Sequence, residues 1–527
     1  MLDSLARSTH LIMEWQSYLV APKSMTSLLR GRIHYAIAVC VTASVSLAAC
    51  VSGSPDGPYQ ATGIKIGEVT GSSATIWTRL TRDSEREQSA ISRPSVQYVH
   101  PETGELVDPP PWPQTPADWV PIVQLPQSIT VDDLEGAVPG ATGEIQVLYR
   151  SEGAADWQST GWQSIDPKRD FTQQFQLTQL TPDTAYAIRV EGRHHGSNVT
   201  STSVEGGFRT APRPDQPARI VFASVTGQDY INKDLEDGYK IYRAMLELDL
   251  DFFVHTGDIL YYDSWAKNLE LARWGWAQMF SLPTNFAFHR QVPTYFMKDD
   301  HDTWLNDAWP SQQSRFMGDF TFAQGQAVFL EQVPIASERT YRTFRWGQDL
   351  QIWLAEARDF RDPNPAPDGP QKTMWGAEQI AWFIESVEAS DATFRILISP
   401  TPLTGPYQNS SENDNHTNLE GFAHEGRVLR NFLAQQANMI VICGDRHYQY
   451  VIDDPETGIR EYATGPVSDE HARGWSNDDV RPEHRYLNLV GGFLTATVER
   501  QDDAPMLMLQ HYGVDGQILN EETIIAE

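Results

Sequence analysis

Carboxylates and imidazoles follow three short apolar runs of the sequence, at residues 252–254, 295–297 and 439–443. Apolar runs of this length, each ending in a polar turn, predict buried strands of a largely parallel sheet. The carboxyl ends of such strands meet at one edge of the sheet, where α/β folds place their chemistry. The residues at these ends that could bind a cation or move a proton are Asp258, Tyr261, Asp263, Asp299, Asp300, His301, Asp302, Asp445 and His447.

Three of these carboxylates, Asp299, Asp300 and Asp302, stand almost side by side. Buried together they would repel one another, and a divalent or trivalent cation removes that repulsion. Each motif alone has an ordinary explanation, because aspartate beside glycine is common in turns and a histidine such as His255 or His301 can be structural. The three motifs together, each following an apolar strand, favour a metal centre.

The composition narrows the classes of partner. The chain has 527 residues, 70 Asp plus Glu, 40 Lys plus Arg and a formal net charge of -30. So acidic a surface repels polyanions, which argues against nucleic acid as an ordinary partner. A small phosphoester can still bind where metal ions invert the local field.

Residues 33–50 form an apolar run that follows two arginines and ends in small residues. This pattern predicts a secretory signal peptide over residues 1–50, and the segment before Met25 fits it so poorly that Met25 is the expected start. The ending Leu47-Ala48-Ala49-Cys50 resembles the bacterial lipobox, so we expect a lipid anchor on Cys50. The alternative is an ordinary signal peptide with an incidental cysteine.

The predicted location follows from this segment. We expect an exported lipoprotein that faces the periplasm or the cell surface, or else a secreted protein. Val51 after the lipobox cysteine favours the outer membrane by resemblance. Maturation would leave Cys443 as the one remaining cysteine, so no intramolecular disulfide is expected, and Cys443 fits a small core residue.

The rest of the chain divides into a tether at residues 51–58, a β-sandwich at residues 59–212 and an α/β domain at residues 217–527, with a Pro-rich linker at 211–217. The alternation across residues 63–80 predicts two antiparallel strands. The Thr-Pro-Asp-Thr sequence before Tyr186 resembles the tyrosine corner of fibronectin type III and related sandwiches. Residues 93–127, rich in Pro and Trp, suggest an irregular insertion.

In the second domain, strands alternate with helices that we expect at residues 235–250, 373–387 and 424–436. This alternation predicts an α/β fold with a β-sheet core flanked by helices.

The three strand-end motifs resemble those of the calcineurin-like metallophosphoesterases, and specifically the alkaline phosphatase D (PhoD-like) branch. The resemblance extends over residues 217–500, and a preceding sandwich is typical of the branch. It implies a metallophosphoesterase fold in which Asp258 bridges two metal ions and Tyr261 binds iron. It also implies metal-ligand roles for Asp300, Asp445 and His447.

The same resemblance implies roles for three further residues. His301, oriented by Asp302, would protonate or stabilise the leaving oxygen. Arg358 in "EARDFR" would hold a phosphate oxygen, with a structural salt bridge as the alternative. His416 in "DNHTN" would be the isolated metal-binding histidine of the superfamily, with a loop histidine as the alternative.

The sequence departs from the branch at its first motif. The branch has Ala-Ser-Cys there, and this chain has Ala223-Ser224-Val225, followed by Asp229. Either Asp229 replaces the missing thiolate or the first metal is bound weakly or differently. A carboxylate in place of a thiolate shifts the preference towards calcium, manganese or magnesium. We therefore expect two metal ions, calcium and/or iron, with manganese or magnesium as alternatives.

These observations predict a monomeric, metal-dependent hydrolase that acts on small phosphate mono- or diesters at the cell envelope. The alternative is a surface binding lipoprotein with a degenerate metal site. A serine hydrolase is disfavoured, because no Gly-x-Ser-x-Gly elbow lies near a strand end.

Overall fold

A computed structural model describes residues 57–89, 91, 93–108, 118–405 and 413–526. The predicted signal peptide, the Cys50 anchor and most of the tether therefore lie outside the described residues. Val51–Glu527 cluster into one compact unit. Within the described residues, every helix falls short of the length and apolar character needed to cross a bilayer.

A nine-stranded sheet carries two of the three predicted motifs. Its strands β12, β13, β14 and β1 run parallel, and β22 pairs antiparallel with β12. In spatial order the strands are β24 (Ile518–Ile525), β23 (Ala504–Tyr512), β22 (Phe493–Gln501), β12 (Ile220–Val225), β13 (Phe252–His255), β14 (Thr294–Phe296), β1 (Ile64–Gly67), β2 (Ser73–Arg79) and β9 (Thr172–Thr178).

A seven-stranded sheet carries the third motif, at the end of β18. Strands β16, β17, β18 and β20 run parallel. In spatial order the strands are β15 (Arg342–Trp346), β16 (Leu350–Leu354), β17 (Phe394–Ser399), β18 (Met439–Cys443), β20 (Arg460–Thr464), β19 (Gln449–Asp453) and β21 (His484–Asn488).

The two sheets share one apolar core. Phe252 and Val254 of β13 belong to it together with Ile396 of β17 and Ile442 of β18, whereas Phe253 belongs to a second core on the other face of β13. Because successive strand residues point to opposite faces, a strand buried on both faces has to be apolar throughout. This is why the motif-bearing strands read as unbroken apolar runs.

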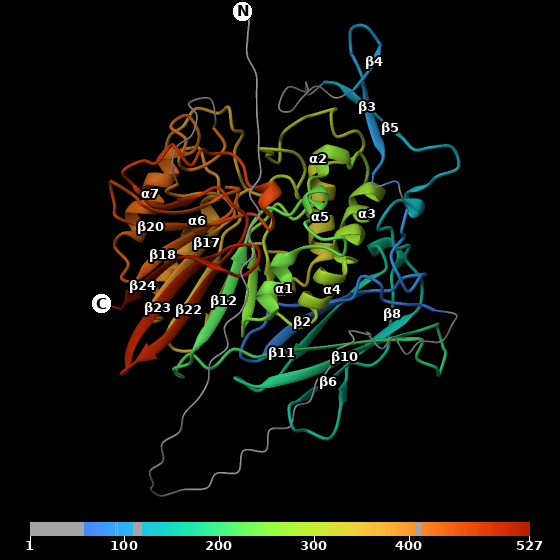
Figure 1. Ribbon diagram of the computed structural model, residues 1–527, viewed down its shortest axis with the longest axis horizontal. Coiled ribbons are helices and arrows are strands. Elements are labelled where there is room, and N and C mark those ends of the chain that lie inside the picture. The colour runs from blue at the N-terminus through green and yellow to red at the C-terminus, as the bar shows by residue number, and fades with distance from the viewer. Residues whose placement is uncertain (1–56, 90, 92, 109–117, 406–412, 527) are drawn as a thin grey trace, which may run out of the picture. The chain divides into compact units, whose positions relative to one another are not determined.

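Helices cover the outer faces of the two sheets, on opposite sides of the molecule (Figure 1). The nine-stranded sheet packs against α1 (Lys240–Leu246), α2 (Tyr262–Trp265), α3 (Leu269–Phe280), α4 (Pro283–His289) and α5 (Phe322–Gln332). The seven-stranded sheet packs against α6 (Ala377–Glu388) and α7 (Ala423–Leu433). The predicted sheet core flanked by helices is confirmed, as two stacked sheets between two helical layers.

The N-terminal strands resemble a β-sandwich. A five-stranded sheet is formed by β6 (Glu144–Ser151), β7 (Gln158–Ser159), β8 (Gln163–Ser164), β10 (Ala185–Arg193) and β11 (Thr202–Arg209). Strands β1, β2 and β9 join the large sheet instead, because β1 pairs with β14. The Tyr186 hydroxyl accepts a hydrogen bond from Thr181 N at 2.9 Å, as a tyrosine corner requires. The specific likeness to fibronectin type III stays a prediction.

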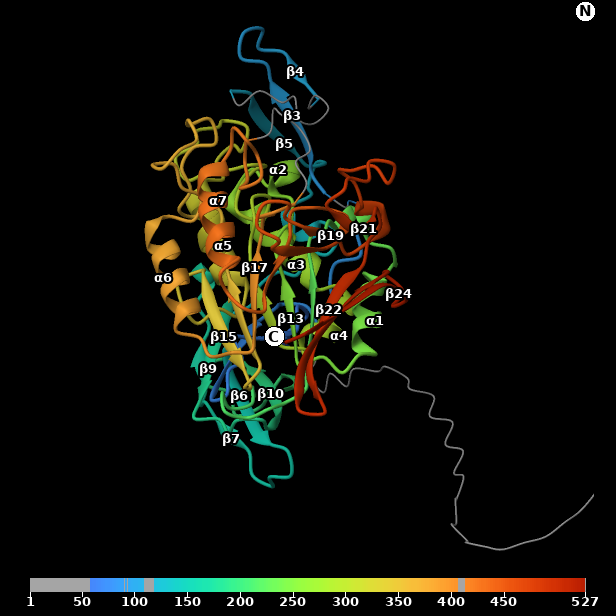
Figure 2. The ribbon, with the colours of Figure 1, turned by 90° about the vertical axis from the view of Figure 1, so that its left-hand side faces the viewer.

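The prediction of an irregular insertion at residues 93–127 was wrong for the described part of that segment. A small antiparallel sheet of β3 (Ser95–Val99), β4 (Leu106–Val107) and β5 (Val120–Gln124) forms there and projects from the rest (Figure 1 and Figure 2). The ring of Tyr98 is buried and stacks on Phe316 with centroids 5.0 Å apart. This packing gives the short strands the apolar contact that their sequence alone lacks.

The helix predicted at residues 235–250 is shorter than expected. Leu235 and Gly238 pair with each other in a turn, and Gly238 has φ 135°. A positive φ is incompatible with an α-helix, in which φ is negative, and glycine is the residue that adopts it readily. The helix α1 therefore begins only after this turn, at Lys240.

Candidate metal centre

The polar turns after the parallel strands of both sheets meet at one rim. The turn after β12 is bonded to the turn after β20, with Thr226 N donating to Gly465 O at 3.1 Å. The turn after β13 is bonded to the turn after β14, with Tyr262 N donating to His301 O at 3.1 Å. The predicted convergence of strand ends is therefore found, and it involves two sheets rather than one.

Two aspartates at this rim have the same unusual backbone conformation. Asp258 has φ 57° and Asp445 has φ 60°, both in the left-handed region that aspartate tolerates better than most residues. Gly257, with φ 121°, precedes Asp258, and a Cβ there would lie 2.7 Å from Asp299 N. Glycine is thus required for the two motif-bearing turns to approach each other.

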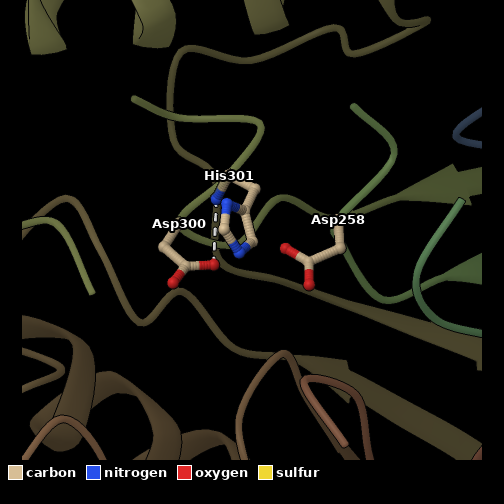
Figure 3. Close-up of side chains that lie close together, drawn as sticks. All are labelled: Asp258, Asp300 and His301. Carbon is tan, nitrogen blue, oxygen red and sulfur yellow. Dashed lines mark hydrogen bonds between the residues drawn. The ribbon is translucent and has the colours of Figure 1, made fainter. Parts of the chain in front are cut away.

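Asp258, Asp300 and His301 form the centre of the site. Each offers one ligand atom, and these atoms all lie within 4.8 Å of one another. Figure 3 shows the His301 ring between the two carboxylates, and its dashed line is the hydrogen bond from His301 N to Asp300 Oδ1, at 2.9 Å. His447 and Tyr261 adjoin this group, because His447 Nε2 lies 3.0 Å from Asp258 Oδ2 and 3.2 Å from the Tyr261 hydroxyl.

The donor set fits metal binding. Asp258 Oδ1 is buried and has no hydrogen-bond partner among the described residues. Burial, followed by the nearby charge of Asp300, raises the pKa of Asp258 well above its ordinary value. Burial also lowers the pKa of His447, so this imidazole is neutral and offers a lone pair. A cation at this point would use the unpartnered oxygen and relieve the repulsion between the carboxylates.

Asp300 is a charged and oriented carboxylate. Oδ1 accepts from His301 N, and Oδ2 accepts from Asp307 N at 2.6 Å. Burial by itself would raise the pKa of Asp300, but Arg358 and His301 outweigh burial and hold the pKa below its ordinary value. An ionised carboxylate fixed by two backbone donors suits a metal ligand.

His301 is oriented by Asp263 and not by Asp302. His301 Nδ1 lies 3.0 Å from Asp263 Oδ2. Burial would lower the pKa of His301, but the Asp263 carboxylate outweighs it, so the pKa is raised well above its ordinary value. Asp263 thus engages Nδ1, and Nε2 is the other ring nitrogen that could take part in chemistry at the centre.

The prediction that Asp302 orients His301 was therefore wrong. Asp302 Oδ1 accepts from Asp299 N at 2.6 Å, and Asp302 Oδ2 accepts from Ile259 N at 3.0 Å. Oδ1 therefore closes the turn after β14, and Oδ2 joins that turn to the turn after β13. Burial raises the pKa of Asp302 to about 7. Asp302 follows His301 in the sequence, but its side chain points to backbone donors and not to the imidazole.

Arg358 forms an ion pair behind the site. Its side chain is 0 % exposed, and Nε donates to Asp299 Oδ1 at 2.5 Å. Nη2 lies 3.7 Å from Asp300 Oδ2. Of the two roles considered for Arg358, the salt bridge is the one that these contacts support.

Replacing Arg358 with methionine should lower the free energy of unfolding by about 3–5 kcal/mol, because Asp299 would be left as an unpaired buried charge. Urea unfolding monitored by circular dichroism measures the loss. Adding Asp299→Asn to the same chain should recover much of it, since no lone charge then remains. A loss below about 1 kcal/mol in the single variant would show that the pair has a smaller role than this.

His416 is not one of the three residues of the compact ligand cluster. His416 Nε2 lies 2.9 Å from Glu425 Oε1 on α7, and its ring packs edge-on against Trp375. His416 Nδ1 is buried without a hydrogen-bond partner among the described residues, so its role as a metal ligand stays a prediction. The charge of Asp414, two residues earlier in the chain, is among those that raise the pKa of Asp445.

Asp445 and Asp229 lie at the edge of the centre. Burial raises the pKa of Asp445 to about 7, with Arg446 opposing and Asp300 among the contributing charges. Asp229 caps the short 3-10 helix η3 (Tyr230–Asn232), because its carboxylate accepts from Ile231 N at 3.3 Å. Its charge contributes to the raised pKa of Tyr261.

His471 is a residue of the centre that the sequence did not single out. Its Nε2 lies 2.8 Å from the Tyr261 hydroxyl, and burial lowers the pKa of His471 to about 3. The available signal was weak: His471 comes seven residues after a further parallel strand, β20 (Arg460–Thr464), but that strand reads Arg-Glu-Tyr-Ala-Thr and lacks the apolar run of the recognised motifs.

Comparisons with known proteins agree with this geometry. A family model described as PhoD-like phosphatase matches residues 222–490, just over half of the 527-residue chain. A solved structure of PhoD is similar to this chain with a TM-score of 0.63 and 16% sequence identity, over 90% of this chain and 91% of that one. The purple acid phosphatase PPD1 from yellow lupin (Lupinus luteus) seeds is similar with a TM-score of 0.53 and 15% identity, over 88% and 74% of the two chains. A search of curated proteins found no match.

Proposed function

The chain belongs to the PhoD-like phosphatase family, and on that premise we propose that it is a metal-dependent phosphoesterase that hydrolyses small phosphate mono- or diesters. The observation that carries the proposal is the meeting of Asp258, Asp300, His301 and His447, from the ends of three strands in two sheets. One carboxylate oxygen of this group, Asp258 Oδ1, is buried and has no hydrogen-bond partner within the described part of the chain.

The proposed centre holds two metal ions. Asp258 would be the shared ligand, because its Oδ2 lies 3.0 Å from His447 Nε2 and 3.4 Å from the Tyr261 hydroxyl, and it offers a ligand atom within 4.8 Å of one from Asp300. Tyr261 and His447 would complete one site, and Asp300 and Asp445 the other. Bound there, the metal pair supplies positive charge to the phosphoryl oxygens and lowers the pKa of a water molecule.

His301 is the proposed general acid for the leaving oxygen. Asp263 holds Nδ1 at 3.0 Å and favours the protonated imidazole, so Nε2 can deliver a proton at the centre. The side chain of His301 is 13% exposed, so substrate can reach it, whereas Arg358 is fully buried. This difference supports a chemical role for His301 and a structural one for Arg358.

The proposed metals are calcium and/or iron, with manganese or magnesium as alternatives. Val225 replaces the expected thiolate, so the donors described above are oxygens and imidazole nitrogens. The remaining described thiol, Cys443, is fully buried, its pKa is raised by burial, and its Sγ lies 3.2 Å from the Tyr450 hydroxyl. Cys443 is thus a core residue and not a ligand of this centre.

An assay of the metal-stripped protein tests the proposal. Aryl phosphate mono- and diesters should be hydrolysed after calcium, manganese or iron is restored, and the monoester-to-diester ratio would assign the preferred class. An absence of turnover with every metal would instead favour the second candidate, a surface binding lipoprotein with a degenerate site, which the Val225 departure motivates.

We also propose export and a lipid anchor on Cys50 at the outer membrane, on the strength of the signal-like run at residues 33–50. Labelling with a radioactive fatty acid should mark the wild-type chain and not a Cys50→Ser variant. We propose that the protein is a monomer, which light scattering would measure. We also propose that it does not bind nucleic acid, so a DNA affinity column should not retain it.

A further inference from the structure

A second histidine lies on the Tyr261 side of the proposed metal pair. His471 Nε2 is 2.8 Å from the Tyr261 hydroxyl, and the rings of His471 and His447 are 4.4 Å apart between centroids. His471 is 1% exposed. One tyrosine oxygen is therefore within hydrogen-bond reach of two buried imidazole nitrogens, because His447 Nε2 is 3.2 Å from it.

Backbone pairing holds His471 beside the first motif. The segment after β20 is bonded to the turn after β12, with Thr226 N donating to Gly465 O and Val467 N donating to Gly227 O, both at 3.1 Å. The 3-10 helix η4 (Asp469–His471) then turns the chain back towards the centre. This segment is thus fastened to the turn that directly follows Val225, the position at which the resembling branch has its thiolate.

Gly227, in the turn after β12, leaves room for the rings of His447 and His471. Gly227 has φ 57°, and a Cβ there would lie 3.0 Å from His447 Cδ2 and 3.4 Å from His471 Nε2. A side chain at that position would crowd both rings.

Hydrogen bonding sets the tautomer of His471. Nδ1 lies 3.1 Å from the side-chain oxygen of Asn232, and that oxygen can only accept. Nδ1 therefore carries the proton, and the lone pair is on Nε2, the nitrogen that faces Tyr261. Metal-binding histidines are oriented in this way by a partner on the ring nitrogen that does not bind the metal.

The two other residues considered for the first motif are placed differently. Val225 is fully buried in the apolar core on the helical face of the sheet. The Asp229 carboxylate caps η3 through Ile231 N. His471 is thus the donor whose ligand atom points at the phenol oxygen.

We infer that His471 is a metal ligand that takes the place of the missing thiolate, completing a first site of Asp258, Tyr261, His447 and His471. This rests on the proposed metal pair and deepens it. Two imidazoles and a phenolate make the first site suited to iron, zinc or manganese, and unsuited to calcium, which prefers an all-oxygen shell.

Metal counting on His471→Gln tests the inference. Glutamine keeps a hydrogen-bonding group near Tyr261 and removes the imidazole. After dialysis of the full chain against Zn²⁺ alone, mass spectrometry should count two ions per wild-type chain and one per His471→Gln chain, with first-site affinity reduced by at least about 10–100-fold. His511→Gln is the matched control: His511 is 0% exposed, its Nε2 is 3.0 Å from Ala463 O, and its variant should keep two ions.

Other outcomes overturn the inference. Two ions at wild-type affinity in His471→Gln would remove His471 from the site and leave the proposed function standing. One ion in Asp229→Asn together with two in His471→Gln would assign the ligand to Asp229. Fewer than two Zn²⁺ ions in the wild type would overturn the inference and leave the proposed function to the turnover assay with calcium, manganese and iron.

A crystal structure of the Zn²⁺-loaded wild type decides the question if His471→Gln does not fold. A ligand requires His471 Nε2 at about 2.0–2.1 Å from the ion. A separation beyond hydrogen-bond distance, about 3.5 Å, would overturn the assignment.

Discussion

Replacing Asp258 with asparagine should abolish metal uptake and lower kcat/KM by about 10³-fold or more. Charge stabilisation by the metals is worth several kcal/mol in the transition state, and each 1.4 kcal/mol is about tenfold in rate. Asp258 is the proposed shared ligand: its Oδ2 lies 3.0 Å from His447 Nε2, it offers a ligand atom within 4.8 Å of one from Asp300, and its Oδ1 lacks a partner among the described residues. Steady-state kinetics and metal analysis on the same preparation measure both losses.

Asp258→Asn should also change the thermal stability of the metal-free protein, and this change should be an increase, whereas metal uptake and activity fall. Without metal, Asp258→Asn should unfold at a higher temperature than the wild type, because burial raises the pKa of Asp258 and keeping its charge at neutral pH opposes folding. With metal at a hundredfold excess over Kd, each site should stabilise the wild type by about 2.7 kcal/mol and should stabilise the variant far less.

Asp251→Asn is a matched control for Asp258→Asn. Asp251 immediately precedes β13 (Phe252–His255), at the end away from the rim, and its carboxylate accepts from Val221 N at 2.8 Å. Asp251 is half-buried, and burial raises its pKa to about 6, so it is also a carboxylate whose charge is disfavoured in the fold. This variant should keep metal and activity. Full activity in Asp258→Asn would refute the bridging role.

Replacing His301 with alanine should lower kcat by about 10²–10⁴-fold on alkyl phosphates and much less on nitrophenyl phosphates. An alkoxide is a poor leaving group and needs a proton, whereas nitrophenolate leaves readily without one. Comparing the two substrate classes measures proton donation separately from binding.

Asp263→Asn should show the same dependence on the leaving group, at smaller size, because Asp263 Oδ2 holds His301 Nδ1 at 3.0 Å. Metal content should be unchanged in both variants. Equal losses on alkyl and nitrophenyl esters would assign His301 to binding or to the fold instead. A larger leaving-group dependence in Asp302→Asn than in Asp263→Asn would restore the role first expected for Asp302.

The residues of the centre were mostly predictable because their signal is local. An apolar strand followed by a turn with Gly-Asp or Asp-Asp-His can be recognised wherever it occurs, and Asp258, Asp300 and His447 were found in this way. The layered fold was predictable for the same reason, since strands buried on both faces must be apolar along their whole length.

The partners of these residues were decided by the tertiary structure. Asp302 adjoins His301 in sequence, yet backbone donors of two turns take both of its oxygens, and Asp263 reaches the imidazole from another turn. Which carboxylate contacts a histidine depends on side-chain direction after a turn, and residue order does not specify that direction.

Local sequence patterns were enough to predict which strands end in candidate metal ligands, and with them the fold class and most of the proposed donor set. His471 could be found only from the three-dimensional packing: the hydrogen bond from Thr226 N to Gly465 O holds the segment after β20 beside the centre, where His471 reaches Tyr261. Contacts of this kind link residues more than two hundred positions apart, as Tyr261 and His471 are at 210. They depend on how two sheets stack, which no local pattern encodes.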